Sequence, residues 1–302
     1  MKLEYIATID DANKTVKDIL LSRLHISHRL LITLKKENAI FLNGISTVVY
    51  HTVCPQDKIA ISFDYEEDNR NIVSKKMPLD IIYEDDWFLV VNKPPHIPVH
   101  PSMLHYEDSL SNGIKFYFDS IGLKKKIRPV NRIDKDTSGL VVFAKNEYVQ
   151  EDFIRQMKTG DFKKEYIAII EGYFKEKIGT INAPIARKEN SIIERCVHPD
   201  GAPSITHYEV LREFSMQDIP ISILKCRLET GRTHQIRVHM AHLGHSLLGD
   251  DLYRGDTSLI SRQALHSSNI SFLHPISKRV VCYQAPFPSD LSFLLETNIK
   301  TS

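Results

Sequence analysis

The sequence predicts an α+β fold, in which a small helix–helix–hairpin unit precedes a larger, strand-rich domain. We expect the larger domain to form around a mixed, mainly antiparallel sheet with flanking helices. Two observations favour this class: helix and strand patterns do not alternate regularly along the chain, and a polar, acidic stretch from residue 64 to 71 separates two groups of them. The expected domains are therefore residues 1–71 and 72–302, and 302 residues suffice for two cores.

The first unit begins with two short helices. Val16, Ile19 and Leu20 have helical spacing, and Ser27 is a suitable N-cap for a second helix with apolar residues between 30 and 34. The dipeptide Asn43-Gly44 then predicts a hairpin turn, and a further strand is expected over residues 58–63.

A concentrated positive charge lies on these helices. Between Lys14 and Lys36 there are six lysines and arginines against the single acid Asp18, a net charge of +5. The whole chain has a formal charge of only +1, so any attraction for a polyanion must come from such local clusters. Arg29 and Lys35 are the phosphate-binding candidates in this segment.

The larger domain is expected to contain four clear strands and one clear helix. The helix should start at an Asn146 cap, place Val149, Phe153 and Met157 on one face, and stop at Gly160. The strands are predicted at residues 88–92, 139–144, 165–171 and 221–228.

Several classes of protein are disfavoured by composition. The four cysteines are far apart and form no C-x-x-C pair, which is typical of free thiols. There is no signal-peptide pattern and no apolar run long enough for a membrane span, so a cytoplasmic protein is expected. The phosphate-loop, dinucleotide-binding and esterase-elbow motifs are missing, which leaves chemistry by side chains.

The most heavily charged turn lies between residues 128 and 137, directly before a buried-looking strand. Asp134 and Asp136 suit a simple turn before Gly139, and composition alone favours that interpretation. A calcium loop is excluded because its twelfth position is Lys145, where a bidentate glutamate is required.

A second loaded stretch, residues 228–245, carries four histidines and two arginines. The histidine spacing matches no zinc motif, and no acid falls between Glu229 and Asp250. The alternative is that residues 231–237 lead a strand into a helix, with Arg232 and Arg237 facing an anion such as a phosphate or the carboxylate of Asp134.

Four motifs and two flanking stretches resemble, in their order along the chain, the RluA-type family of RNA pseudouridine synthases. They are N-R-I-D-K-D-T-S-G-L from Asn131, K-x-x-Y ending at Tyr166, G-R-T-H-Q-I-R ending at Arg237, R-Q-A-L-H from Arg262, and the flanking stretches 92–101 and 269–275. The family usually has histidine where Asn131 stands. The N-terminal segment resembles the alpha-L RNA-binding motif.

The resemblance implies a catalytic role for Asp134, with Arg237 as its ionic partner and Tyr166 against the uracil. Arg132 would grip or replace the flipped nucleotide, and Leu265 would line the uracil pocket. It implies no cofactor and no metal. Residues 124–126 and Arg128 are expected to bind phosphates, with a solvated loop as the equal alternative.

The expected partner is therefore structured RNA, with ribosomal large-subunit RNA favoured over transfer RNA, and the expected state is a monomer. Two rival hypotheses remain open at this point. One is an inactive RNA-binding factor in ribosome assembly, and the other is a metal-dependent RNA hydrolase built on the histidine-rich stretch.

Overall fold

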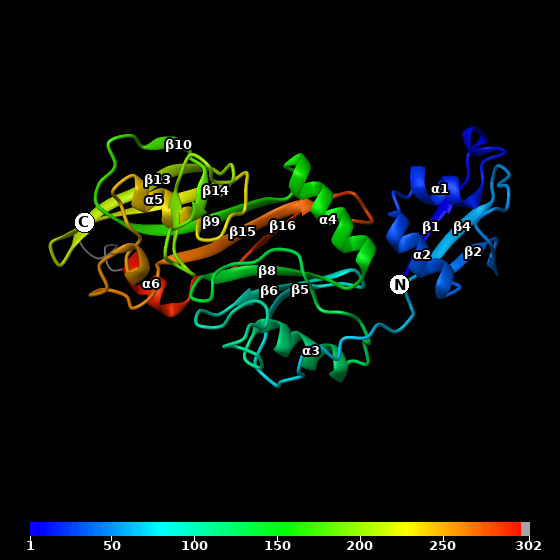
Figure 1. Cartoon of the computed structure of the whole chain (residues 1–302), viewed down its shortest axis with the longest axis horizontal. Helices are drawn as coiled ribbons and strands as arrows, with labels where there is room; N and C mark the ends of the chain where they lie inside the picture. The colour runs from blue at the N-terminus through cyan, green and yellow to red at the C-terminus, as the bar shows by residue number, and fades with distance from the viewer. Residues whose placement is uncertain (297–302) are drawn as a thin grey trace.

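The computed structural model describes residues 1–296, which form a small sheet and a large sheet joined by an extended segment (Figure 1). The small sheet has four strands in the order β1-β4-β2-β3. Its elements are β1 (Lys2–Ile6), the 3-10 turn η1 (Ile9–Asp11), α1 (Val16–Ser22), α2 (His28–Lys36), β2 (Ile40–Leu42), β3 (Ile45–Ser46) and β4 (Lys58–Ser62).

The predicted local signals of this unit are present. The Ser27 side chain accepts a hydrogen bond from the Leu30 N–H at the start of α2. Asn43 and Gly44 both have positive φ, at 51° and 83°, as a tight hairpin turn between β2 and β3 requires. Strand β1 was not predicted. It has only five residues and pairs antiparallel with β4, which lies more than fifty residues further along the chain, so little local pattern marks it.

The large sheet follows the order β10-β13-β14-β9-β15-β8-β6-β5, with β16 on β15 and β7 on β8. Among its described pairs, only β15 with β8 is parallel, which confirms a mixed, mainly antiparallel sheet. Its strands are β5 (Asp80–Glu84), β6 (Phe88–Lys93), β7 (Arg128–Pro129), β8 (Ser138–Ala144), β9 (Lys163–Glu171), β10 (Ile178–Asn182), β13 (Ile205–Met216), β14 (Ile219–Leu228), β15 (Leu265–Leu273) and β16 (Val280–Gln284). A separate pair is β11 (Ile185–Arg187) with β12 (Arg195–Val197).

Helices cover this sheet from several sides. They are α3 (Leu110–Ser120), α4 (Glu147–Thr159), α5 (Gln235–His242), the 3-10 turn η2 (Asp251–Tyr253) and α6 (Ser289–Glu296). The Asn146 side chain caps α4 by accepting from the Val149 N–H, and Gly160 ends it with φ 80°, as the sequence predicted. All four predicted strands are present as β6, β8, β9 and β14.

Strand β8, in the middle of the large sheet, requires a glycine at position 139. Every residue of β8 is buried, and Gly139 within it has φ 110°. A Cβ on Gly139 would lie 2.3 Å from the carbonyl oxygen of Ser267 on β15. Only glycine permits both this φ and this close approach, so Gly139 allows the parallel pairing of β8 with β15.

The small unit packs against α4 of the large one (Figure 1). The Ser27 hydroxyl donates to the Glu151 carboxylate at 2.6 Å, and the Phe63 ring lies 6.1 Å from the Tyr148 ring and 6.0 Å from the Trp87 ring. The two units therefore share an apolar and polar contact in addition to their covalent connection.

The segment that connects the two units is also fixed by contacts with the large unit. Residues 64–79 contain no helix or strand, yet the Glu67 carboxylate forms a buried ion pair with the Arg128 guanidinium, including an Nη1–Oε2 bond of 2.8 Å. The Arg128 guanidinium is buried and already paired with Glu67, so it is not free to bind a phosphate. The expectation that Arg128 binds phosphate is therefore corrected. Lys125 is likewise buried, with its amine bonded to the Tyr65 carbonyl.

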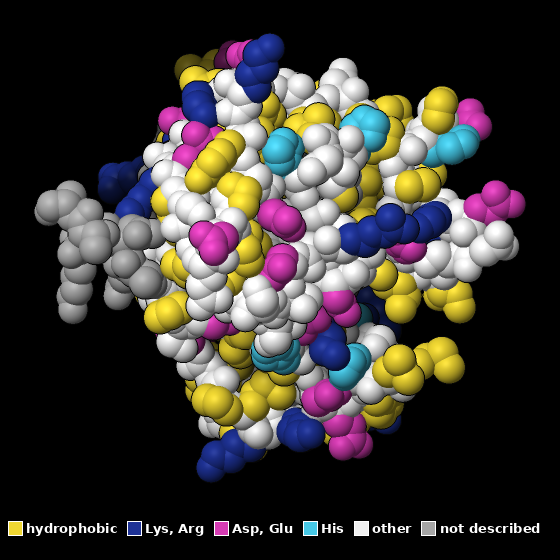
Figure 2. Space-filling model, turned by 90° about the vertical axis from the view of Figure 1, so that its left-hand side faces the viewer, with side chains coloured by type: hydrophobic (Ala, Val, Ile, Leu, Met, Phe, Trp, Pro, Cys, Tyr) yellow, Lys and Arg dark blue, Asp and Glu magenta, His cyan; other side chains and the backbone are white. Residues whose placement is uncertain are grey.

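The surface has no single dominant charge at the end of the large sheet remote from the small unit. Figure 2 shows acidic, basic and apolar side chains intermixed there. No helix among residues 1–296 is both long enough and apolar enough to span a bilayer.

Candidate active site

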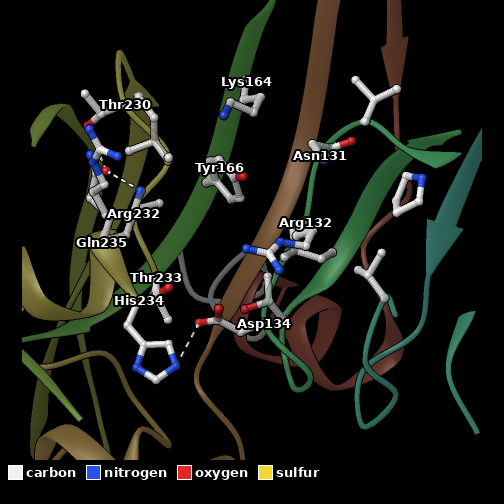
Figure 3. A pocket seen from close by; sticks show the side chains of 18 of the residues that line it. Asn131, Arg132, Asp134, Lys164, Tyr166, Thr230, Arg232, Thr233, His234 and Gln235 are labelled. Atoms are coloured by element: carbon white, nitrogen blue, oxygen red, sulfur yellow. Dashed lines mark hydrogen bonds and ion pairs between the residues drawn. The ribbon is translucent and has the colours of Figure 1, made fainter. Parts of the chain in front are cut away.

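An open cleft of about 970 Å³ crosses the large sheet where the turn before β8, the strands β9 and β15, and the loop from β14 to α5 meet. Asp134, Arg132, Tyr166, Leu265 and Arg237 all line it, so the structure brings together residues from four separate segments of the sequence. Figure 3 shows Asp134 and Arg132 on one wall and the Thr230–Gln235 segment on the other, with Tyr166 between them.

The turn that carries Asp134 is fixed from behind by buried polar groups. The fully buried Lys93 amine donates to the Lys135 carbonyl at 2.8 Å, and the Arg262 guanidinium donates to the Asp136 carbonyl at 3.0 Å. The Asn131 side chain donates to the Leu140 carbonyl at 3.0 Å and accepts from the Val142 N–H at 2.9 Å. Asn131 therefore braces the turn against β8, which is a structural role for the residue that departs from the family pattern.

Asp134 is held by one arginine, and that arginine by a second acid. Arg237 Nη1 donates to Asp134 Oδ2 at 3.1 Å, while Arg237 Nε and Nη2 bind both oxygens of Asp250 at 2.7 and 2.8 Å. Asp250 is fully buried and the Asp134 side chain is 25% exposed, so the outer carboxylate faces the cleft. The bidentate pair fixes the plane of the guanidinium and therefore the position of Nη1, which donates to Asp134.

The electrostatics keep Arg237 charged. Burial acts to lower the pKa of Arg237, but the hydrogen bonds and charge of Asp250, with a further contribution from Asp134, raise it above its ordinary value. The Arg237 guanidinium also lies 5.0 Å above the centre of the Tyr253 ring. A permanent cation therefore lies beside the Asp134 carboxylate, in hydrogen-bonding contact with it.

Tyr166 and Leu265 form the apolar floor. Tyr166 on β9 is 5% exposed, and Leu265 at the start of β15 is also buried. Burial, reinforced by the charge of Asp134, raises the pKa of Tyr166. The phenol therefore remains protonated at neutral pH, and the Tyr166 side chain lines the cleft.

His234 lies at the mouth of the site. Its Nε2 is 4.0 Å from Asp134 Oδ2, and its Nδ1 is 3.0 Å from the Tyr253 hydroxyl. Burial lowers the pKa of His234, and the Arg237 charge acts in the same direction against the opposing effect of Asp134. The neutral imidazole is therefore favoured at neutral pH.

Two of the remaining histidines of that stretch bind groups outside the cleft. His239 is buried, with its ring nitrogens 2.8 Å from the Thr206 hydroxyl and 2.9 Å from the Ala183 carbonyl, and the His245 ring is 3.1 Å from the Glu171 carbonyl. In residues 1–296, no group of three or more His, Cys, Asp or Glu side chains is arranged to hold a metal ion.

Two predicted phosphate-binding residues lie outside the cleft, on α2. Lys35 is exposed, and the Arg29 side chain is 84% exposed with its Nε 3.2 Å from Glu147 Oε1. Two residues that shape the site were not singled out from the sequence. Asp250 stands in a Gly-Asp-Asp turn after two apolar leucines, and Lys93 ends a buried strand, and in both cases a charge in an apolar context was the available signal.

Comparison with known proteins identifies the class of enzyme. Residues 87–242 match the family described as RNA pseudouridylate synthase. An uncharacterized RNA pseudouridine synthase of Bacillus subtilis, YjbO, is 38% identical over 93% of this chain and 98% of its own length. Ribosomal large subunit pseudouridine synthase D of Salmonella typhimurium is 36% identical over 80% of this chain and 76% of its own length.

A solved structure supports the same class of enzyme. Human RNA Pseudouridylate Synthase Domain Containing 1 matches with a TM-score of 0.58 and 28% identity, over 70% of this chain and 84% of its own. The chain belongs to the RNA pseudouridine synthase family, and the resemblance to its RluA-type branch is confirmed. Enzymes of this family isomerise uridine to pseudouridine in RNA.

Proposed function

We propose that this protein converts specific uridines of ribosomal large-subunit RNA into pseudouridine, with Asp134 as the catalytic carboxylate and without a cofactor. The observation that carries the proposal is the ion pair of Asp134 with Arg237 on the wall of a cleft lined by Tyr166. The choice of RNA is supported by the name of the Salmonella typhimurium relative. Transfer RNA is the alternative substrate. We further propose that the protein acts in the cytoplasm as a monomer.

The isomerisation needs no redox step. The bond from uracil N1 to ribose C1′ breaks, the base turns while bound, and C5 bonds to C1′. C5 then loses its proton and the freed N1 gains one, so the product is an isomer of the substrate. A carboxylate suits this chemistry because it can attack C1′ or stabilise the charge that develops there, as carboxylates do in glycoside hydrolysis. Both the covalent route and a glycal-like route are compatible with Asp134 at this position.

Arg237 supports Asp134 in this proposal. Its hydrogen bond holds the Asp134 carboxylate in place on the wall of a cleft that RNA would close to water. Asp250 is a positioning residue, because it touches Arg237 and not the cleft wall that would meet the substrate. Two acids and one arginine then leave a net negative charge close to C1′.

Tyr166 would stack on the uracil, with Leu265 beside it. Both side chains are buried in the cleft floor, and an apolar, aromatic surface suits a flat base. The raised pKa of Tyr166 makes the phenolate rare, which favours a stacking and hydrogen-bonding role over early proton abstraction.

Binding would require the target nucleotide to leave the helix, at about a few kcal/mol of lost stacking. Arg132 is exposed two residues from Asp134 and points into the cleft, so we assign it to the flipped nucleotide or to the space it leaves. Residues 1–71 would form the RNA-binding domain and 72–302 the catalytic domain. Arg29 and Lys35 would bind phosphates outside the cleft.

The test compares the protein with its Asp134→Asn variant on unmodified ribosomal and transfer RNA, with no cofactor or metal added. New pseudouridines are mapped by carbodiimide labelling and primer extension. We expect new stops with the wild type alone, since loss of an essential nucleophile costs more than about 5 kcal/mol, or over a thousandfold in rate. Equal stops with both proteins would remove Asp134 from its role. Tight RNA binding without any stops would favour the inactive assembly-factor hypothesis.

A further inference from the structure

Lys164 is a cation of the cleft wall that the reaction described above does not use. It lies on β9 two residues before Tyr166, and because side chains alternate along a strand, both face the cleft. Figure 3 shows the Lys164 amine projecting above Tyr166 toward the Thr230–Gln235 segment. A Cβ on Gly231 would lie 3.3 Å from Lys164 Nζ, so the absence of a side chain at Gly231 leaves room for the amine.

The amine has no partner within the protein. Among residues 1–296, no hydrogen bond or ion pair involves Lys164 Nζ. Burial lowers the pKa of Lys164, and no acid acts in the opposite direction. The amine thus stands in a partly desolvated position without the compensation that buried charges usually have.

Three other lysines of this fold are buried, and in each the cost of burying the amine is offset by contacts with oxygen atoms of the protein. Lys93 donates to three carbonyls at 2.7, 2.9 and 2.8 Å. Lys145 lies 2.8 Å from the Glu84 carboxylate, and Lys125 bonds to the Tyr65 carbonyl and lies over its ring. Lys164 differs from all three, and it is also the one that faces a cleft, so its acceptor would come from outside the chain.

We infer that Lys164 binds a phosphate of the RNA backbone next to the target uridine. The ligand must be anionic, because an unpaired ammonium group is stabilised most by a negative charge. It must also reach Lys164 through the cleft that holds the base. The phosphodiester groups flanking the flipped uridine have both properties. Lys164 would therefore hold the backbone of the nucleotide whose base stacks on Tyr166, and so orient C1′ toward Asp134. This inference rests on the proposed function.

The chain supplies a matched control. Lys163 precedes Lys164 on β9 and is exposed on the other face of the strand, so Lys163→Met removes the same charge from the same strand without entering the cleft. Lys164→Met removes the ammonium and keeps most of the side-chain volume, whereas Lys164→Arg restores a cation. Thermal melting of each variant reports whether the fold survives.

Binding is measured by filter retention in an Asp134→Asn background, with a stem-loop oligonucleotide that contains the uridine mapped in the activity assay. Lys164→Met should weaken binding about tenfold or more, as loss of a charge-assisted bond does. The salt slope should fall in magnitude by about 0.7, the value for one phosphate of a single strand. Lys163→Met should resemble the parent protein, and Lys164→Arg should recover most of the affinity.

The decisive comparison replaces one phosphate by a neutral methylphosphonate, either 5′ or 3′ of the target uridine. With one of these two RNAs, Lys164→Met should cost no further affinity, because its partner charge is already gone. A Lys164→Met loss that is unchanged with both RNAs, or that equals the Lys163→Met loss, overturns the inference. Absence of pseudouridine with the wild-type protein would instead reject the proposed function, since the mapping assay reports that separately.

Discussion

The contact of Arg237 with two carboxylates makes a quantitative prediction for Arg237→Lys. The guanidinium binds Asp250 with two N–H groups and Asp134 with a third, at 2.7, 2.8 and 3.1 Å. A lysine keeps the charge but lacks the planar fork, so it cannot hold both oxygens of Asp250 and still reach Asp134 from a fixed direction. Since Asp250 is fully buried, we expect the ammonium to stay with Asp250 and to release Asp134.

The magnitude follows from the contact that is lost. A hydrogen bond to a charged group contributes about 1.5 to 3 kcal/mol. If that interaction acts on the transition state, Arg237→Lys should lower the single-turnover rate by about 10- to 150-fold, at about 1.4 kcal/mol per tenfold. The rate is followed by pseudouridine formation at the mapped site, with enzyme in excess over RNA.

A matched variant separates this effect from a general loss of arginine. Arg227 is exposed on β14 outside the cleft, and Arg227→Lys should leave the rate unchanged. RNA affinity should change little in either variant, because the total charge is the same. A rate for Arg237→Lys within threefold of the wild type would refute the assignment of Arg237 as the partner that Asp134 needs.

Three further predictions concern the strands beneath the site. Tyr166→Phe keeps the ring and loses the hydroxyl, so RNA affinity by filter binding should stay within about threefold while the single-turnover rate falls at least tenfold; an unchanged rate would remove the hydroxyl from the chemistry. Gly139→Ala places a Cβ 2.3 Å from the Ser267 carbonyl oxygen and should lower the free energy of unfolding by more than about 3 kcal/mol in urea melts. Gly160→Ala, where φ is also positive but nothing lies within 4 Å, should cost only about 1 kcal/mol, and equal losses would contradict the steric explanation. Burial lowers the pKa of His266 from 6.5 to about 4, so its contribution to stability is present above pH 6.5 and is lost as the pH falls toward 4. This loss amounts to on the order of 3 kcal/mol; the His266→Gln variant should show a correspondingly flatter decline over that range, and parallel curves for the two proteins would be inconsistent with it.

Local features of the chain were readable without the fold. The Asn146 cap, the apolar face of α4 and the Gly160 stop each depend on residues within one or two turns, and all three are present. The strands β6, β8, β9 and β14 were likewise predictable, because buried strands leave runs of apolar or alternating residues. The family resemblance rested on short motifs, and their order along the chain identified the class of enzyme.

Which charged side chains form ion pairs was decided only by the tertiary structure. Asp134 and Arg237 are separated by 103 residues, and no local pattern shows that their side chains touch. Glu67 and Arg128 are 61 residues apart, and their buried pair removed Arg128 from the expected phosphate-binding set. Asp250 became a partner of Arg237 only through the turn that follows α5.

The physical reason is the range of the interactions. Helix caps, turns and strand burial depend on backbone geometry and on neighbours in sequence, so the sequence alone determined them for α2, α4 and β8. A charged side chain on a turn can equally be solvated, paired or free for a ligand, and the choice depends on groups brought near by distant strands. For Arg128, Arg237 and Lys164 the sequence determined only the charge, and the packing of the large sheet decided which became paired and which faces the cleft.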